Sequence, residues 1–411
     1  MSSALKPRDA RDVEAAVQWA VAERRPLEIV GAGTKRAIGR PSQSDLTLDL
    51  SGLSGVTLYE PEELVLSAKA GTPLAAIEAL LAAHGQELAF EPIDYGPLLG
   101  GAPGAATIGG VIAANLSGPR RLKAGAARDH FLGVTAVSGR GETFKSGGRV
   151  VKNVTGYDLC KLIAGSWGTL AAMTEVTLKV LPRAETSHTV LLLGLDEAAA
   201  VQAMTLAMRS PCDVSGAAHL PASVAMRMPV PDAATAGGAL TALRLEGVAP
   251  SVAHRRTVLE ALLRPLGRLE HLDDAGSVVL WRAIRDVAPF AAAGQDDDRL
   301  VWRLSAAPSR GAEIGARIAA QAGAELLYDW AGGLIWAALP PREDAGAALV
   351  RGALVQAGGG HATLVRAPAA VRAAVDVFQP QEPGVAALSR RVKDGFDPRG
   401  VLNAGRMWAG V

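Results

Sequence analysis

The stretch GAPGAATIGGVIAANLSGPRR, residues 101–121, decides how the first half of this chain is interpreted. A glycine inside a helix costs about 1 kcal/mol relative to alanine, so the adjacent Gly109 and Gly110 indicate an approach to the backbone closer than a Cβ would permit. Thr107 is placed to cap a helix that begins near Ile108, and the first turn of a helix favours negative charge. The stretch therefore predicts a surface for a flat, phosphate-bearing ligand. Close packing of two helices would also require small residues here, and that alternative stays open.

The composition is that of an ordinary globular protein without a surplus of either charge. The chain has 411 residues, which predicts two or three domains, and it carries 42 Lys and Arg against 41 Asp and Glu. This balance, without basic blocks, predicts no nucleic-acid partner. Cys160 and Cys212 lie far apart and form no CxxC pair. We therefore expect no self-contained iron–sulfur or structural zinc site, but two buried thiols in a reducing compartment.

The N-terminal residues, MSSALKPRDARDVEAAVQWA, lack the charged start and apolar core of a signal peptide. No uninterrupted apolar run reaches about 18 residues, so no membrane-spanning helix is predicted. We expect a cytoplasmic protein, and attachment to the inner face of a membrane through partner subunits stays open.

Periodic patterns over the first half of the chain predict short strands with few helices. Helices are expected over 8–24 and 73–85. Strands are expected over 26–30, 45–53 and 173–183, with a strand pair joined at Glu60-Pro61 and a hairpin that turns at 139–141.

After about residue 186 the pattern changes to strands that alternate with helices. Strand–helix pairs begin near residues 189, 239 and 299, and a hairpin over 325–339 and a helix over 343–357 follow. Strand–helix–strand–strand–helix–strand is the order of a ferredoxin-like sandwich, so a single antiparallel sheet backed by helices is expected. The final FDPRGVLNAGRMWAGV, residues 396–411, alternates turns with apolar residues and is expected to dock on another part of the chain.

The glycine-rich loop GAGTKRAIG, residues 31–39, follows a predicted strand. Arg36 stands where the third glycine of a GxGxxG motif would fall, and the loop lacks the GK[ST] of a P-loop. What remains is a turn whose successive N–H groups can form an anion-binding nest, with a plain strand-end turn as the alternative. AGTP, residues 70–73, is explained as a helix cap, with Thr72 at the N-cap and Pro73 in the first helical position.

Other chemistry is sparse. Residues 150–180 hold Lys152 and Tyr157, which are candidate acid–base groups, although a structural turn is favoured there. His130 is the only histidine inside a candidate cofactor motif, and Arg128-Asp129-His130 is also explained as an ion-pair turn. The sequence has no HExxH, no GxSxG and no histidine cluster at metal-binding spacing, so no metal site is predicted.

Five runs carry a resemblance to a known family. They are IVGAGTKRAIG (29–39), AGTPLAAIEALLAAHGQ (70–86), GAATIGGVIAANLSGPRRLKAGAARDHFLGV (104–134), GRVVKNVTGYDLCKLIAGSWGTLAAMTEVTLKVLPR (148–183) and FDPRGVLNAGRM (396–407). These runs resemble the FAD-binding subunits of the vanillyl-alcohol-oxidase (PCMH-type) flavoprotein superfamily, in particular the FAD-binding E subunits of bacterial glycolate oxidases. The resemblance covers residues 5–183 and returns at 394–407.

The resemblance implies an α+β fold in which no domain is a Rossmann fold. It implies a PCMH-type FAD-binding domain over 1–185 with subdomains of about 1–52 and 53–185, a ferredoxin-like domain over 186–375, and a segment over 376–411 that returns to the flavin domain. The flavin would lie between the first two domains. The FAD would be non-covalent, because no histidine lies in a pattern expected for covalent attachment.

The resemblance also implies FAD contacts at positions along the first domain. The first pyrophosphate loop would be Gly31, Ala32, Gly33, Thr34 and Lys35, the adenosine side would be Gly71 and Thr72, and the segment beneath pyrophosphate and ring would be Thr107, Ile108, Gly109 and Gly110. Further implied contacts are Asn115, Ser117, Gly118, Pro119 and Arg120 around the phosphates, Asp129, the backbone of Glu175 and Val176, and Asn403 from the C-terminal segment.

Two departures from the family qualify what the resemblance implies. The chain lacks the HxGDGNxH-like metal and substrate motif of catalytic hydroxy-acid dehydrogenases, and their LNPGK appears as LNAGR, with Arg406. The resemblance therefore implies a subunit that binds FAD in a complex oxidising glycolate, a 2-hydroxy acid, to glyoxylate. A paralogous FAD-binding subunit would carry the catalysis, and an iron–sulfur subunit would take the electrons. The alternatives are a scaffold with a vestigial flavin site, and a stand-alone FAD-dependent oxidoreductase in which Lys152, Tyr157 or Arg406 contacts substrate.

Overall fold

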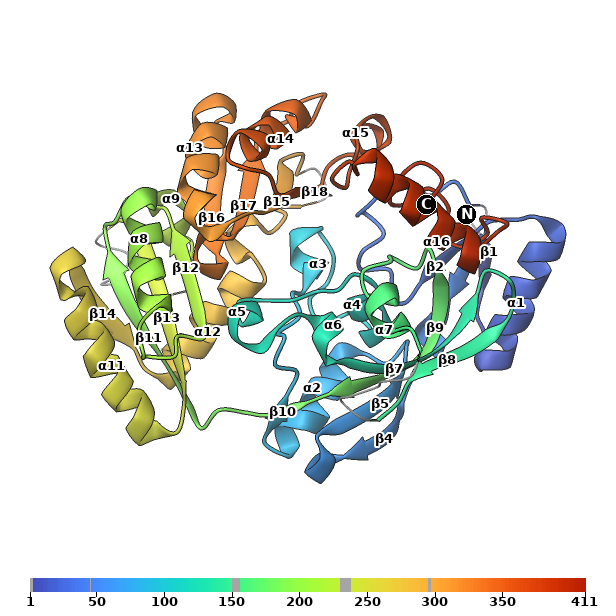
Figure 1. Ribbon diagram of the computed structural model, residues 1–411, viewed down its shortest axis with the longest axis horizontal. Coiled ribbons are helices and arrows are strands. Elements are labelled where there is room, and N and C mark those ends of the chain that lie inside the picture. Colours follow the sequence, from blue (N-terminus) through green and yellow to red (C-terminus); the bar gives the residue numbers. More distant parts are fainter. Residues whose placement is uncertain (1–2, 45, 150–155, 230–237, 295–296) are drawn as a thin grey trace. The chain divides into compact units, whose positions relative to one another are not determined.

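A computed structural model of the chain describes residues 3–44, 46–149, 156–229, 238–294 and 297–411. The chain divides into two compact units. The first comprises Met1–Ser117, Gly125–Arg183 and Asp376–Val411, and the second comprises Gly118–Ala124 and Ala184–Val375. Each unit builds its own sheets and covers them with helices (Figure 1).

The first unit contains a small parallel sheet and a larger antiparallel sheet. The parallel sheet has the order β1–β3–β2, formed by Ser3–Leu5, Leu46–Asp49 and Leu27–Val30. The antiparallel sheet has the order β4–β5–β9–β7–β8, formed by Val56–Glu60, Val65–Lys69, Ala171–Lys179, Phe131–Ser138 and Thr143–Gly147. The predicted strand pair and hairpin are confirmed, because β4 pairs with β5 and β7 pairs with β8.

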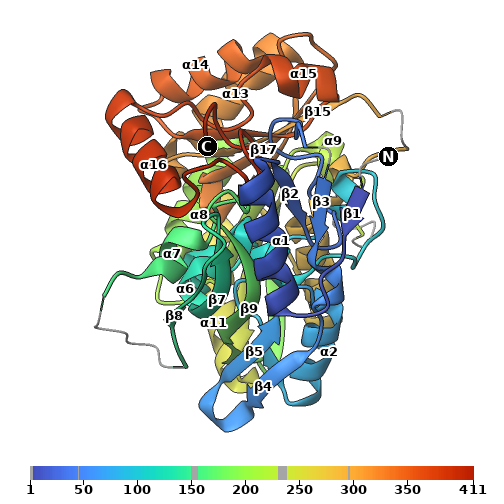
Figure 2. The same ribbon diagram turned by 90° about the vertical axis from the view of Figure 1, so that its right-hand side faces the viewer.

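Helix α1, Ala10–Glu23, covers the parallel sheet with the apolar positions that its sequence repeats at helical spacing. Its buried Val13 and Val17 belong to one core with Leu27, Leu48 and Leu402. The C-terminal segment therefore forms part of this core, and it runs beside β2, where Leu402 pairs in parallel with Leu27 (Figure 2).

Helix caps were predicted at Thr107 and Thr72, and the structure bears on both. The helix expected after Thr107 is confirmed as α4, Ile108–Ala113, with Thr107 at its N-cap. The predicted cap at Thr72 is wrong, because α2, Leu74–Ala83, begins one residue later with Pro73 as its N-cap. The Thr72 hydroxyl instead donates to the Lys69 carbonyl at 2.6 Å and accepts the Gly55 N–H at 3.0 Å. The remaining elements are α3 (Tyr95–Leu98), α6 (Ala127–His130), α7 (Leu159–Ile163), α16 (Pro383–Phe396) and the strand pair β6 (Gln86–Glu87) with β10 (Leu181–Pro182).

The second unit is organised around one eight-stranded antiparallel sheet with the order β14–β11–β13–β12–β16–β17–β15–β18. Its strands are, in chain order, Thr186–Leu193, Gly216–Leu220, Leu240–Gly247, Arg268–Leu272, Leu300–Ser305, Glu325–Asp329, Leu334–Leu339 and His361–Arg366. Its helices include α5 (Arg121–Ala124), α8 (Glu197–Met208), α9 (Ala222–Ala225), α11 (Ala249–Leu263), α12 (Asp274–Arg285), α13 (Gly311–Ala322), α14 (Ala347–Gln356) and α15 (Ala369–Ala374).

This sheet contains two ferredoxin-like repeats. Strands β11–β14 with α8 and α11 have the strand–helix–strand–strand–helix–strand order, and β15–β18 with α13 and α14 repeat it. The repeats join through β12 and β16, where His219 lies opposite Tyr328. The predicted single antiparallel sheet backed by helices is confirmed, but it holds two such repeats where the sequence pattern predicted one.

No helix in the described ranges is long and apolar enough to cross a membrane. The same ranges contain no group of three or more His, Cys, Asp or Glu side chains that could bind a metal ion. Cys160 and Cys212 are both buried and unbridged.

Candidate functional site

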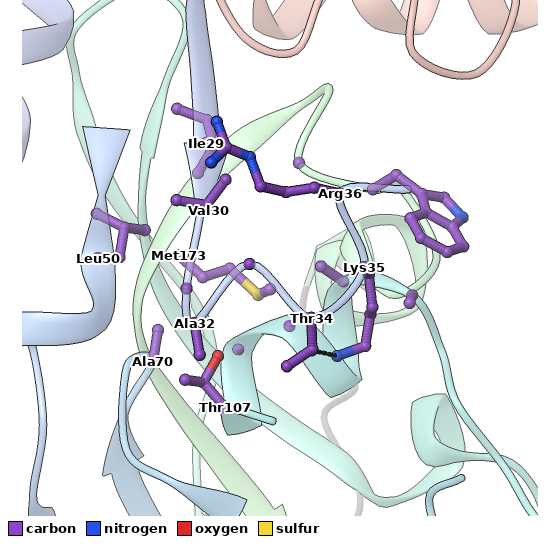
Figure 3. Close-up of a pocket in the computed structure, with 18 of the residues that line it drawn as sticks. Ile29, Val30, Ala32, Thr34, Lys35, Arg36, Leu50, Ala70, Thr107 and Met173 are labelled. Atoms are coloured by element: carbon purple, nitrogen blue, oxygen red, sulfur yellow. Dashed lines mark hydrogen bonds between the residues drawn. The ribbon is translucent and has the colours of Figure 1, made fainter. Parts of the chain in front are cut away.

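A cavity in the first unit lies where the loop after β2 meets α4, β9 and the C-terminal segment (Figure 3). It encloses about 670 Å³ of space between atoms, part of which is open solvent. The lining residues are Ile29, Val30, Gly31, Ala32, Gly33, Thr34, Lys35, Arg36, Leu50, Ala70, Thr107, Gly109, Gly110, Ala113, Ala114, Trp167, Gly168, Ala171, Met173 and Arg406.

The predicted loop Gly31–Lys35 forms one wall of this cavity. Gly33 has a φ of +74°, a conformation that glycine adopts without strain. Within the described residues, the N–H groups from Ala32 to Lys35 donate no hydrogen bond. Successive N–H groups left available in such a turn are the donors of an anion-binding nest.

Lys35 places a cation on the same wall. Its side chain is buried, and its ammonium donates to the Thr34 hydroxyl at 3.0 Å (Figure 3). Burial lowers the pKa of Lys35 to about 8, although Asp94 acts in the opposite direction and Arg406 adds to the lowering. Lys35 makes no salt bridge within the described part of the chain, so an anion in the cavity would stabilise its charged form.

The glycine pair of α4 divides between two roles. A Cβ on Gly109 would lie 2.7 Å from the Ala70 Cβ, and the Gly109 N–H donates to the Ala70 carbonyl at 2.8 Å. Gly109 is therefore small because α4 packs closely on the turn after β5. A Cβ on Gly110 would lie 3.3 Å from the Thr107 hydroxyl and 3.4 Å from the Lys35 ammonium, on the cavity wall. Gly109 therefore packs on a turn and not on a second helix, and the contact of Gly110 with a ligand stays a prediction.

The Trp167–Gly168 turn forms another wall, and the C-terminal segment fixes it. The Asn403 side chain accepts the Ile29 N–H at 2.7 Å and donates to the Trp167 carbonyl at 2.7 Å. The Arg406 guanidinium donates to the Lys35 carbonyl at 2.7 Å and lies 5.6 Å from the centroid of the Trp167 ring. Asn403 does not line the cavity, so its implied contact with flavin stays a prediction.

Several predicted contacts form the structure around the cavity without lining it. Gly71 donates its N–H to the Leu53 carbonyl at 2.8 Å, and Ile108 donates to the Thr72 carbonyl at 3.0 Å. Asn115 accepts the Arg128 N–H at 3.0 Å, Ser117 accepts the Ala127 N–H at 3.1 Å, and Asp129 accepts the Ala126 N–H at 2.9 Å. These side chains shape turns that connect α4, α6 and β5.

The segment Gly118–Ala124 belongs to the second unit. Its Arg120 forms a charge-paired fork with Glu246, with the Nε–Oε2 distance 2.9 Å, and the Gly118 carbonyl accepts the Trp330 indole N–H at 3.0 Å. Lys123 pairs with Asp213 in the same unit. Arg120 and its neighbours Gly118 and Pro119 do not line the cavity, and their implied closure over phosphates stays a prediction that the Glu246 partner disfavours.

Glu175 and Val176 lie in the middle of β9, between β5 and β7. The cavity is lined instead by Ala171 and Met173, two to five residues earlier on the same strand. Lys152 and Asn153 lie outside the described residues. Tyr157 is 90% exposed and does not line the cavity.

The lining residues that were not predicted as FAD contacts are Ile29, Val30, Arg36, Leu50, Ala70, Ala113, Ala114, Trp167, Gly168, Ala171 and Met173. Arg406 was predicted only as a substrate contact of a stand-alone oxidoreductase, and it also lines the cavity. The apolar side chains of Leu50, Ala70 and Met173 lie together at one side of the cavity, and Lys35 lies at the other (Figure 3). The cavity therefore combines an apolar part with a loop of available N–H groups and a buried ammonium. That combination fits a dinucleotide, because its rings are apolar and its diphosphate is negatively charged.

Comparison with known proteins gives the same class of ligand. Residues 2–147 match a family model described as "FAD binding domain". The glycolate oxidase subunit GlcE of Escherichia coli (strain K12) is 33% identical over 396 residues, which are 96% of this chain and 95% of that protein. The glycolate oxidase subunit GlcD of Bacillus subtilis (strain 168) is 28% identical over 221 residues, which are 54% of this chain and 44% of that protein.

Among solved structures, p-cresol methylhydroxylase with substrate bound superposes with a TM-score of 0.70 over 99% of this chain and 88% of that chain, at 13% identity. At this identity the likeness shows the fold alone. The predicted PCMH-type fold class and the predicted FAD cofactor are confirmed by these matches.

Proposed function

Because the chain belongs to the family of the glycolate oxidase subunit GlcE, we propose that it is the FAD-binding subunit of a glycolate (2-hydroxy acid) oxidase complex. In this proposal the FAD is non-covalent. A paralogous FAD-binding subunit carries the oxidation of glycolate to glyoxylate, and an iron–sulfur subunit takes the electrons. The 28% identity to a subunit named GlcD supports a paralogous partner of this kind.

The observation that carries the proposal is the buried Lys35 ammonium beside the available N–H groups of Ala32–Lys35. Two phosphates in the cavity would accept from these N–H groups and return the pKa of Lys35 toward its usual value. The apolar surface of Leu50, Ala70 and Met173 would receive the adenine ring.

The same residues limit what the chain does in the reaction. When bound, a flavin supplies an acceptor for the hydride of a 2-hydroxy acid. The only ionisable side chains among the described lining residues are Lys35, Arg36 and Arg406. Arg36 is paired with Glu28, and Arg406 donates to backbone carbonyls. The lining offers no carboxylate or imidazole to take the hydroxyl proton, so we assign that base to the paralogous subunit.

The test is the visible spectrum of the purified chain, before and after glycolate is added without oxygen. We expect flavin absorbance that stays oxidised in the isolated chain and bleaches once the paralogous and iron–sulfur subunits are added. Bleaching of the isolated chain would contradict the assignment of catalysis to a partner. A chain that holds no flavin, and takes up none when FAD is supplied, would contradict the proposal as a whole.

A further inference from the structure

The C-terminal clasp, defined here as residues Lys393–Arg406, begins with a buried lysine in a helix whose other residues are exposed or half-buried. Lys393 is the only buried residue of α16. Its ammonium donates to the Thr169 carbonyl at 2.7 Å, to the Leu402 carbonyl at 2.9 Å and to the Asp397 carboxylate at 2.6 Å. All three donors of the ammonium are therefore used, and one of them reaches the turn that follows Trp167.

Asp397 then fixes the path of the chain toward the cavity. Its side chain is fully enclosed, and its two oxygens accept the N–H groups of Val401 and Leu402 at 2.9 and 2.8 Å. One carboxylate thus binds the Lys393 ammonium and closes the turn over residues 397–402. That turn delivers Asn403 and Arg406 to the cavity wall.

The clasp reaches three parts of the wall through those two side chains. Asn403 joins Ile29 of β2 to Trp167, and a Cβ on Gly168 would lie 2.7 Å from the Asn403 amide nitrogen. Arg406 holds the carbonyl of Lys35. The backbone of the N–H loop at Lys35, the end of β2 and the Trp167 turn are therefore fixed by residues that the Lys393–Asp397 pair positions.

We propose that Lys393 and Asp397 are positioning residues for the cofactor cavity, which set FAD affinity by fixing Asn403 and Arg406. This inference rests on the proposed function for its ligand. Two charges removed from water often cost more than an apolar pair of similar volume. The apolar contacts of α16, such as Phe396 on Phe144, involve side chains that are only half-buried. A charged pair that satisfies four backbone groups therefore serves to orient the turn.

The experiment compares Asp397→Asn, Asn403→Ala and their double variant in the full chain. Glu382→Gln is the matched control, because it removes the same charge from an exposed position at the start of α16, outside the clasp. Two quantities are measured: the Kd for FAD, and amide hydrogen exchange of the FAD-free chain over 29–38 and 163–170.

We expect each single variant to weaken FAD binding about tenfold, and the double variant to be no weaker than the weaker single variant, because both changes act through one turn. Exchange should rise over 29–38 and 163–170 and stay unchanged in β5, β7 and β9, while Glu382→Gln resembles the wild type. Additive losses of affinity, wild-type behaviour of Asp397→Asn, or faster exchange throughout the first unit would overturn the inference.

Two results separate this inference from the proposed function. If the wild-type chain binds no FAD, the proposed function is wrong, while the exchange comparison still tests whether the pair fixes the wall. If Asp397→Asn does not fold, Lys393→Met replaces it, because Asp397 then keeps both backbone donors. If neither variant folds, the pair is structural and the inference is wrong.

Discussion

Replacing Lys35 by methionine should make the FAD-free chain more stable and its binding of FAD weaker. Burial lowers the pKa of Lys35 from 10.5 to about 8, and one pKa unit corresponds to about 1.4 kcal/mol, so the charged form destabilises the fold by about 3 kcal/mol. This cost is fully present below pH 8, where both folded and unfolded chains hold the proton. It disappears as the pH rises from about 8 to 10.5, because the unfolded chain then binds more protons than the folded one.

Binding of a diphosphate should raise the pKa of Lys35 again. If FAD returns the pKa of Lys35 to its usual value, the complex takes up a proton above pH 8, and the Kd should rise about thirtyfold between pH 7 and pH 9.5. In Lys35→Met this pH dependence should vanish. At pH 7 the variant should bind FAD about ten- to a hundredfold more weakly, because a charge-assisted hydrogen bond contributes about 1.5–3 kcal/mol.

The assay is fluorimetric titration of FAD into the chain at several pH values, with urea unfolding of the FAD-free proteins. Any titration of FAD itself appears equally in the variant. Lys6→Met, at a side chain that is 74% exposed, is the matched control and should change neither quantity. Equal FAD affinity of wild type and Lys35→Met at pH 7, or a Kd of the wild type that is flat with pH, would refute the reasoning.

Three further outcomes follow from contacts within each unit. Gly31→Ala should weaken FAD binding, because its Cβ would overlap the Thr107 hydroxyl. Adding Thr107→Ala should restore the affinity, and titration of FAD into both variants checks this. Arg120→Ala should lower the free energy of unfolding by about 1.5–3 kcal/mol, because Glu246 loses one charged partner and keeps Arg244 and Ser215. Lys123→Ala at an exposed pair should cost less than about 1 kcal/mol, and urea unfolding checks both values. Cys160 is buried and burial raises its pKa to about 11, so a thiol reagent at pH 8 should leave Cys160 and Cys212 unmodified in the native chain and modify both in urea.

The parts of the cavity that could be predicted are those that the chain brings together locally. The loop Gly31–Lys35 follows a strand and carries its own glycines, and the helix after Thr107 is announced by its cap and its small residues. Both lie on the cavity wall, and their contacts with FAD stay predictions. Trp167 and Arg406 lie on the same wall. Asn403 holds the Trp167 turn there by joining it to Ile29 of β2, more than 130 residues earlier in the chain. No local sequence pattern predicts such a contact.

The segment SGPRR shows how distant partners override a local interpretation. Two adjacent arginines after a glycine-rich helix suggest a phosphate site, yet Arg120 is paired with Glu246 and the Gly118 carbonyl accepts from Trp330. Both partners lie far along the chain and could not be assigned from spacing. Similarly, β12 has the sequence GAAHL, whose glycine and alanines have low strand propensity. Its place inside the sheet comes from pairing with β13 and β16. Because the sequence pattern did not predict this strand, the division of the sheet into two ferredoxin-like repeats could not be predicted.

The most direct test of the account is the FAD content of Gly110→Leu. A side chain at this position would project from the cavity wall against Thr107 and Lys35. Gly384→Leu, at an exposed helical glycine with open space around it, is the matched control. We predict about one FAD per chain in the wild type and in Gly384→Leu, and none in Gly110→Leu, which should unfold at the temperature of the FAD-free wild type. A Gly110→Leu chain that retains one FAD would contradict the placement of the cofactor in this cavity.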